Sequence, residues 1–155
     1  MNYGQKVKDF LDQKVIAVAG VSRKPQGEVG NLIYKKFKSA GYSVYPINPF
    51  ADYIEGDKCY PKLSATPKKP DAVLITTNPA ASLDVVKQCI EGGIQRVWFH
   101  KAFGAGSFSE EAANLGEEKG LTVIRSGCPM MFIRDADFGH KMMAFFLRLF
   151  GRLGS

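Results

Sequence analysis

The regular alternation of short apolar runs with amphipathic stretches constrains this chain more than any other feature of its sequence. Five runs contain few polar residues and are rich in Val, Ile, Ala and aromatic residues. Runs of this kind are typical of strands buried on both faces of a parallel sheet. In chain order they are Lys14–Ala19, Tyr42–Ile47, Asp71–Ile75, Arg96–Phe99 and Leu121–Ile124. Pro46 lacks a backbone donor, which predicts the end of the second strand or an edge position.

Apolar residues at helical spacing fill the stretches between these runs. Before the first run, Tyr3–Asp12 places Val7, Phe10 and Leu11 on one face of a helix. A second amphipathic helix follows the first run, and Gly41 is expected at its end because glycine suits the left-handed conformation found there. The apolar pattern of this helix consists of Val29, Leu32, Ile33, Phe37 and Ala40.

Two further helices carry start signals. Asn78 followed by Pro79 fits an N-cap and the first helical position. Ser107 and Glu110 have capping-box spacing, which predicts a helix that runs to about Lys119. The apolar face of the earlier of these two helices comprises Leu83, Val86 and Ile90.

Strictly alternating strands and helices imply a parallel sheet with right-handed crossovers. We therefore predict an α/β fold, a Rossmann-like three-layer sandwich with a mostly parallel sheet of about five strands and helices on both faces. A short additional strand is expected near Lys58–Tyr60. Residues 1–155 are expected to form a single domain with a helical tail at about 137–150. The apolar stripe Phe138–Phe150 in this tail fits either a helix that caps the sheet or a dimer contact.

Composition and charge narrow the classes of partner. No apolar run approaches the roughly 18–20 residues of a membrane span, and no signal-peptide pattern opens the chain. The three cysteines are an odd number without CxxC spacing. They disfavour a disulfide framework and a zinc site, so a cytoplasmic location is the expectation. The net charge of +6 suits a phosphate-bearing ligand, whereas nucleic-acid binding would require denser basic clusters.

In open α/β sheets, ligands bind outside the carboxyl ends of the strands. The loops that follow the five runs are therefore the candidate site, and each is rich in Gly, Pro, Asn or hydroxyl residues. They are Gly20–Gly30, Pro46–Phe50, Thr76–Ala80, His100–Gly106 and Arg125–Phe132.

The loop after the first run is the most informative of these. Gly20 follows the strand directly, where a side chain would obstruct a tight turn and the close approach of a phosphate. Other residues of the loop offer a hydroxyl, positive charge, or glycine at a helix start, whose free N–H groups favour an anion. They are Ser22, Arg23, Lys24, Gly27 and Gly30. This pattern favours a bound phosphate over a loop that only joins a strand to a helix.

The loop after the second run distinguishes between cofactors. NAD-dependent Rossmann folds place an Asp or Glu there to hold the ribose hydroxyls. This chain has Ile47-Asn48-Pro49-Phe50 at that position, and Asp52 lies beyond the proline turn. The first loop also departs from GxGxxG, because it reads Gly-x-Ser with an insertion before the next glycines. Both departures disfavour NAD, whereas Arg23 and Lys24 keep NADP as an alternative.

Three segments together resemble the stand-alone CoA-binding domain proteins, which are similar to the CoA-binding domain of the succinyl-CoA synthetase α subunit. The segments are GVSRKPQGEVGNLIYKKFKSAGYSVYPINP, DAVLITTNPAA and AANLGEEKGLTVIRSGCPMMF. The resemblance covers residues 10–132, most of the chain. It implies that the ligand is coenzyme A or an acyl-CoA. The resemblance does not extend to the synthetase domain with the phosphorylated histidine, so we expect residues 1–155 to lack that catalytic domain.

The resemblance also implies roles for residues at matching positions. The residues that would wrap the pyrophosphate and the 3′-phosphate end are Gly20, Val21, Ser22, Arg23 and Lys24. Asn48 and Pro49 would lie near the adenosine. Those that would line the nucleotide or pantetheine path are Thr76, Thr77, Asn78 and Pro79. Cys128 and Pro129 match the terminal Cys-Pro turn of the family.

Two other functions compete with non-catalytic binding of CoA. One is that of a small NAD(P)-dependent oxidoreductase, and the other is thioester chemistry at Cys128. Arg125 lies near Cys128 in sequence and would favour its thiolate, the nucleophilic form; alternatively, Cys128 is a small buried residue in a tight turn. The sequence contains no complete acid–base–nucleophile set, which favours binding without catalysis. It does not specify an acyl group, and it leaves both a homodimer and a partner protein open.

Overall fold

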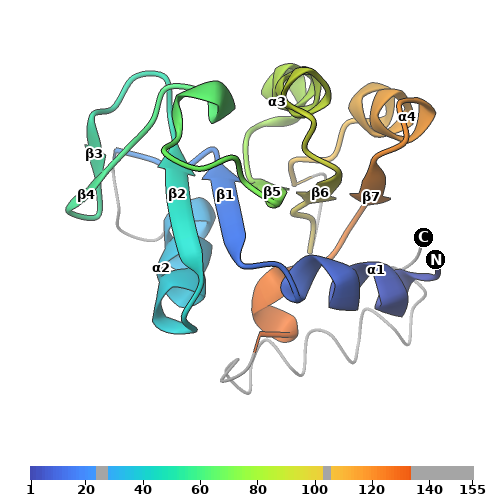
Figure 1. Ribbon diagram of the computed structural model, residues 1–155, viewed down its shortest axis with the longest axis horizontal. Coiled ribbons are helices and arrows are strands. Elements are labelled where there is room, and N and C mark those ends of the chain that lie inside the picture. Colours follow the sequence, from blue (N-terminus) through green and yellow to red (C-terminus); the bar gives the residue numbers. More distant parts are fainter. Residues whose placement is uncertain (24–27, 103–105, 134–155) are drawn as a thin grey trace.

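The computed structural model describes residues 1–23, 28–102 and 106–133. Its centre is a five-stranded parallel sheet with the strand order β2-β1-β5-β6-β7 (Figure 1). The strands are β1 (Val15–Ala19), β2 (Ser43–Ile47), β5 (Ala72–Ile75), β6 (Arg96–Phe99) and β7 (Thr122–Ile124). Each apolar run of the sequence forms one of these strands, so the predicted α/β fold is confirmed.

Helices cover both faces of the sheet (Figure 1). They are α1 (Tyr3–Leu11), α2 (Val29–Ser39), α3 (Pro79–Gly92) and α4 (Glu110–Glu118). Ile16 and Val18 point into the core beneath α1 and α2, whereas Ala17 and Ala19 point into the core beneath α3 and α4. Burial on both faces explains why the strands show apolar runs instead of alternating polar and apolar residues.

The segment between β2 and β5 contains short elements. β3 (Tyr53–Ile54) and β4 (Asp57–Lys58) pair as an antiparallel hairpin, and a 3-10 turn, η1 (Leu63–Ala65), follows. The strand expected near Lys58–Tyr60 is therefore shifted, and Tyr60 forms an isolated bridge with Ile47. A second 3-10 turn, η2 (Pro129–Met131), follows β7.

Pro46 lies within β2, at the edge of the sheet. β2 pairs with β1 on one side, so the other side of Pro46 meets no strand of the five-stranded sheet. The carbonyl of Pro46 accepts a hydrogen bond of 3.0 Å from the Tyr60 N–H. The edge position, one of the two predicted for this proline, is confirmed.

The buried face of α2 differs from the predicted one. Val29 and Leu32 are 38% and 42% exposed, and Ala40 lies beyond the helix and is also exposed. The buried positions of α2 are Gly30, Asn31, Ile33, Tyr34 and Phe37. The prediction is confirmed for Ile33 and Phe37 and is wrong for the other three residues, because it followed apolarity alone. Gly30 and Asn31 instead turn inward to contact the loops above the sheet.

The start of α4 also differs from the prediction. Ser109, not Ser107, is the N-cap, and its hydroxyl accepts from the Ala112 N–H. Ser107 is buried, and its hydroxyl lies 2.7 Å from the Ile75 carbonyl oxygen. The predicted capping box is therefore wrong because Ser107 fastens the loop to the end of β5.

Among the described residues, no helix is long and apolar enough to cross a membrane. The predicted tail helix at 137–150 lies outside the described residues, as do Lys24 and Gly27.

Candidate functional site

The order of the strands marks one position on the sheet as the place for a ligand. From β1 the chain passes through α2 to β2 on one side, and it later enters β5 on the other side of β1. The direction of strand addition thus reverses between β1 and β5. In open α/β sheets the crevice at such a reversal, outside the carboxyl ends of the strands, is the usual ligand site.

The ends of β1 and β5 approach each other closely at this reversal. Gly20 has a φ of +100°, and a Cβ on it would stand 2.5 Å from the Thr77 nitrogen and 2.6 Å from the Thr76 carbonyl carbon. The Thr76 hydroxyl donates to the Ala19 carbonyl at 2.8 Å. The prediction that a side chain on Gly20 would obstruct the turn is therefore confirmed, and the obstructing atoms belong to Thr76 and Thr77 in the loop after β5. The predicted approach of a phosphate stays a prediction.

The N-terminus of α2 sits directly above this junction. A Cβ on Gly30 would stand 2.6 Å from the Thr76 hydroxyl oxygen and 3.1 Å from the Gly20 carbonyl oxygen. Two glycines and a threonine thus let the first turn of α2 approach the ends of β1 and β5. Backbone N–H groups of a helix start are brought to the place where a ligand is expected.

The start of α2 differs from the starts of the other helices. Side chains of Asn2, Asn78 and Ser109 cap α1, α3 and α4. The N-cap of α2, Glu28, makes no side-chain hydrogen bond to the helix, and the first turn contains no acidic residue. By contrast, Glu110 and Glu111 occupy the first turn of α4. Among these four helices, α2 is the one whose N-terminal N–H groups receive no hydrogen bond from the N-cap side chain, and N–H groups of this kind can bind an anion.

A buried asparagine holds the loop after β1 against α2. Asn31 is fully buried; its side-chain oxygen accepts from the Ser22 N–H at 2.7 Å, and its amide nitrogen donates to the Ser22 carbonyl at 2.9 Å. Sequence reasoning missed Asn31. The signal that could have identified it is its place next to Gly30, on the face of α2 that turns toward the loops. Arg23 follows this clamp and is exposed.

Asn48 ties the loop after β2 to the loop after β1. Its side-chain amide donates to the Val21 carbonyl at 2.8 Å, and its own N–H donates to the Tyr60 carbonyl at 3.0 Å. Pro49 is exposed beside it. The structure thus brings Asn48 together with the predicted phosphate loop. Its side chain joins the loop after β2 to the loop after β1.

The predicted residues after β5 mostly serve the start of α3. Asn78 is the N-cap, with its side-chain oxygen accepting from the Ala81 N–H at 3.0 Å, and Pro79 is the first helical residue. The hydroxyls of Thr77 and Ser82 lie 2.9 Å apart, and Ser82 donates to the Ser107 carbonyl at 2.7 Å. These contacts connect the loop after β5, through the first turn of α3, to the loop after β6.

Cys128 lies at the N-cap of η2 and is 1% exposed, within the core beneath α1 and α2. Arg125 instead binds Glu117 through two hydrogen bonds of 2.9 and 3.0 Å and also binds Asn114. The hydrogen bond from Arg125 lowers the pKa of Glu117 below its ordinary value. Because Arg125 binds Glu117 and Asn114, the structure lends no support to its role as an activator of the Cys128 thiol. Burial favours the packing role of Cys128 and Pro129.

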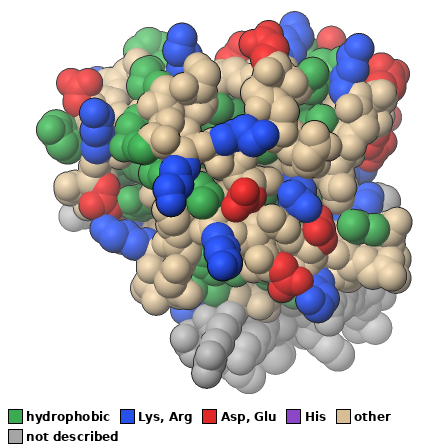
Figure 2. All heavy atoms as spheres, viewed as in Figure 1, with side chains coloured by type: hydrophobic (Ala, Val, Ile, Leu, Met, Phe, Trp, Pro, Cys, Tyr) green, Lys and Arg blue, Asp and Glu red, His purple; other side chains and the backbone are tan. Residues whose placement is uncertain are grey.

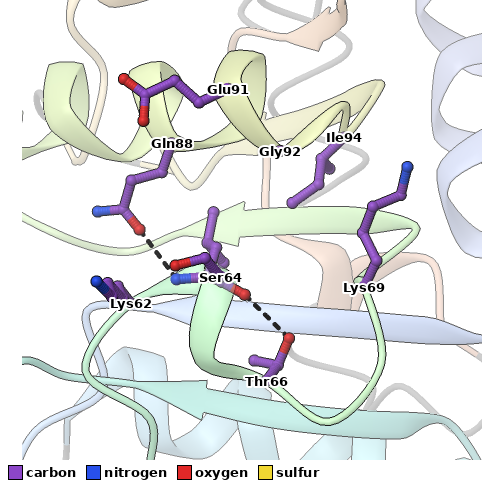
Figure 3. Close-up of a pocket in the computed structure, with 9 residues that line it drawn as sticks. Lys62, Ser64, Thr66, Lys69, Gln88, Glu91, Gly92 and Ile94 are labelled. Atoms are coloured by element: carbon purple, nitrogen blue, oxygen red, sulfur yellow. Dashed lines mark hydrogen bonds between the residues drawn. The ribbon is translucent and has the colours of Figure 1, made fainter.

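A cavity of about 420 Å³ lies elsewhere, between η1 and the last turns of α3 (Figure 3). Its lining includes Lys69 and Ile94, which precede β5 and β6, so it lies toward the amino ends of these strands. Gln88 in its wall accepts from the Leu63 N–H at 3.0 Å and donates to Asp84 at 2.8 Å. This cavity is therefore separate from the candidate site.

On the face shown in Figure 2, basic and acidic side chains are interspersed.

Known proteins provide independent evidence on this chain. Residues 14–134 match the model of a family described as the CoA binding domain. An uncharacterized protein, YneT, from Bacillus subtilis is 29% identical over 124 residues, which cover 79% of this chain and 88% of YneT. An ADP-forming acetate–CoA ligase from Archaeoglobus fulgidus is 28% identical over 121 residues. That match covers 74% of this chain but only 18% of the ligase.

A solved structure supports the same relationship. A hypothetical protein from Pyrococcus horikoshii has 30% sequence identity and a TM-score of 0.74, and the match covers 83% of this chain and 87% of that protein. The family match, which includes all five strands of the sheet, shows that this chain belongs to the CoA binding domain family.

Proposed function

We propose that this protein binds coenzyme A or an acyl-CoA at the carboxyl edge of the sheet and does not itself catalyse a reaction. The observation that carries the proposal is the N-terminus of α2, which has no side-chain cap and is seated by Gly20 and Gly30 over the reversal between β1 and β5. The backbone N–H groups of a first helical turn and the positive end of the helix dipole suit a pyrophosphate. The family and the acetate–CoA ligase relatives favour CoA as its source.

In this proposal the backbone makes most of the contacts. Thr76, Asn48 and Asn78 already use their side chains in hydrogen bonds within the protein. The loop from Gly20 to Ser22 would wrap the pyrophosphate, with Gly27 and Gly30 allowing its close approach. Arg23 and Lys24 would add charge toward the 3′-phosphate. Pro49 would lie near the adenosine, and the path of the pantetheine would follow the segment from Thr77 to Pro79.

An NAD(P)-dependent oxidoreductase is the second candidate, and the loop after β2 argues against it. Residues 48–51 (Asn-Pro-Phe-Ala), which directly follow the strand, contain no carboxylate for the ribose hydroxyls, and Asp52 lies beyond the proline turn, directly before β3. In the present proposal, the protein is cytoplasmic and binds one nucleotide, and a partner protein carries out the chemistry. The acetate–CoA ligases, whose chains are several times longer, contain a related region within one polypeptide.

A thermal-shift panel tests this proposal against the alternative. Protein is heated with CoA, acetyl-CoA, NAD, NADP or ADP at matched concentrations. A ligand present at about 100 times its Kd stabilises the folded state by about 2.7 kcal/mol, so CoA should raise the Tm measurably. A rise with NAD or NADP and none with CoA would contradict the proposal. Turnover of acetyl-CoA by the purified protein would contradict its non-catalytic part.

A further inference from the structure

The side chain of Phe50 is unusually exposed for an aromatic residue. It is 78% exposed in the loop that follows β2, at the carboxyl edge of the sheet. The preceding Pro49 is exposed as well. A phenylalanine in this environment gains little of the hydrophobic stabilisation that burial would provide. Two apolar rings are thus presented to solvent beside the proposed nucleotide site.

The backbone that carries Phe50 is held in place. The Phe50 N–H donates to the side-chain oxygen of Asn48 at 2.7 Å. The amide group of the same Asn48 side chain donates to the Val21 carbonyl at 2.8 Å, and the Asn48 N–H donates to the Tyr60 carbonyl. The turn with Phe50 is therefore fastened directly to the loop after β1. The backbone that carries the ring is therefore in place before any ligand arrives, so only the side-chain rotamers of Phe50 remain to be ordered on binding.

The chemistry of this loop points to a base and not to a sugar or a phosphate. Residues 48–51 contain no charged side chain, and Asn48 uses its amide in the turn. The carboxylate of Asp52 follows them, directly before β3. What the loop can offer a nucleotide is an apolar aromatic face. Purine bases stack on such faces with little demand for specific hydrogen bonds.

We propose that Phe50 is the stacking platform for the adenine ring of the bound nucleotide. This inference rests on the proposed function, because it assumes that an adenine nucleotide occupies the edge beside the β1 loop. Recognition of the base is thereby assigned to Phe50, which is not one of the polar or glycine residues of the site. Affinity for the adenosine half of CoA then depends on Phe50, whereas affinity for the pantetheine half does not.

Calorimetric titration of Phe50→Ala, Phe50→Tyr and wild type with CoA tests this inference, with 4′-phosphopantetheine as the ligand that lacks adenosine. Phe50→Ala should weaken CoA binding about 5- to 150-fold, the range for loss of one base-stacking aromatic. Phe50→Tyr should retain nearly wild-type affinity, and Phe50→Ala should leave 4′-phosphopantetheine affinity unchanged. The matched control is Tyr53→Ala, which removes another aromatic ring that is 71% exposed, three residues further along.

A fluorescent variant provides a second measurement. Trp98, the single tryptophan, is fully buried, so its emission should barely respond to CoA. In Phe50→Trp, stacking should quench the new emission on addition of CoA but not of 4′-phosphopantetheine. The inference is overturned if Phe50→Ala binds CoA like wild type, if Tyr53→Ala loses as much affinity, or if CoA binds Phe50→Trp without quenching. Absence of CoA binding to wild type would instead refute the proposed function, and this inference with it.

Discussion

Gly20 and Thr77 approach so closely that a Cβ on Gly20 would stand 2.5 Å from the Thr77 backbone nitrogen. The contact joins the end of β1 to the loop after β5, across the reversal of the sheet order. Gly20 also has a φ of +100°, a conformation that L-residues with a side chain rarely adopt. The fold therefore requires glycine at this position before any ligand is considered.

Replacing Gly20 should damage the fold as well as binding. Gly20→Ala should lower the free energy of unfolding by about 3 kcal/mol or more, because backbone strain and a steric clash add. Gly41→Ala is the matched control: Gly41 has a φ of +96° but nothing within 4 Å of its Cβ position. It should cost only about 1–2 kcal/mol. Urea denaturation without ligand measures both, and equal losses would contradict the clash.

The sequence predicted the strands well because each is an apolar run buried on both faces. The predictions failed where a tertiary contact overrides a local pattern. Val29 and Leu32 are apolar but exposed, because α2 turns Gly30 and Asn31 inward to meet the loops. The capping-box spacing of Ser107 could not reveal that its hydroxyl would bind the Ile75 carbonyl, a contact across 32 residues of sequence. Likewise, the hydrogen bonds between Asn31 and Ser22 depend on how α2 is oriented on the sheet, which the local sequence pattern does not determine.

Removal of the Asn31 side chain should loosen the loop after β1. Asn31→Leu fills a similar volume but removes the partners of the Ser22 N–H and carbonyl. We expect a loss of stability of about 1–3 kcal/mol, the cost of leaving buried polar groups without partners. Binding of CoA should weaken in parallel. Asn114→Leu is the control: it removes a hydrogen bond with Arg125 that is exposed to solvent, and it should change stability by no more than about 0.5 kcal/mol. Unchanged stability of Asn31→Leu, measured by urea denaturation, would show that the clamp is not needed.

The three cysteines should react slowly in the folded protein. Cys59, Cys89 and Cys128 are 4%, 0% and 1% exposed. Burial raises the pKa of Cys89 to about 12, so its reactive thiolate is rare at neutral pH. Modification by a disulfide reagent, followed by mass spectrometry, should be on the order of a hundredfold slower in buffer than in urea. Rapid adduct formation between CoA disulfide and native Cys128, lost in Cys128→Ser, would revive a redox role for this thiol.

Asp57 should make the free energy of unfolding depend on pH. It binds Lys38 at 2.6 Å and the Tyr34 hydroxyl at 2.5 Å, and these hydrogen bonds hold its pKa below the ordinary 3.8. Because the pKa is lower in the folded state, the stabilisation is fully present above about pH 4 and is lost as the pH falls through the folded-state value.

Asp57→Asn tests this dependence. The variant should lose about 1–2 kcal/mol at pH 7, since Lys38 is half exposed and contributes little. The difference from wild type should shrink below pH 4, as thermal melts at several pH values would show. Asp12→Asn, which removes the exposed pair with Lys8, should cost no more than about 0.5 kcal/mol. A difference for Asp57→Asn that grows on acidification would contradict the assigned direction of the pKa shift.

The measurement that tests the central claim most directly is a two-dimensional NMR titration of the ¹⁵N-labelled protein with CoA. The backbone amide signals of Gly20, Ser22, Gly30 and Thr77 should shift, because they surround the proposed pyrophosphate site. Signals of Leu63, Gln88 and Ile94, around the cavity near the opposite edge, should stay in place. Shifts confined to that cavity, or none at saturating CoA, would contradict the account.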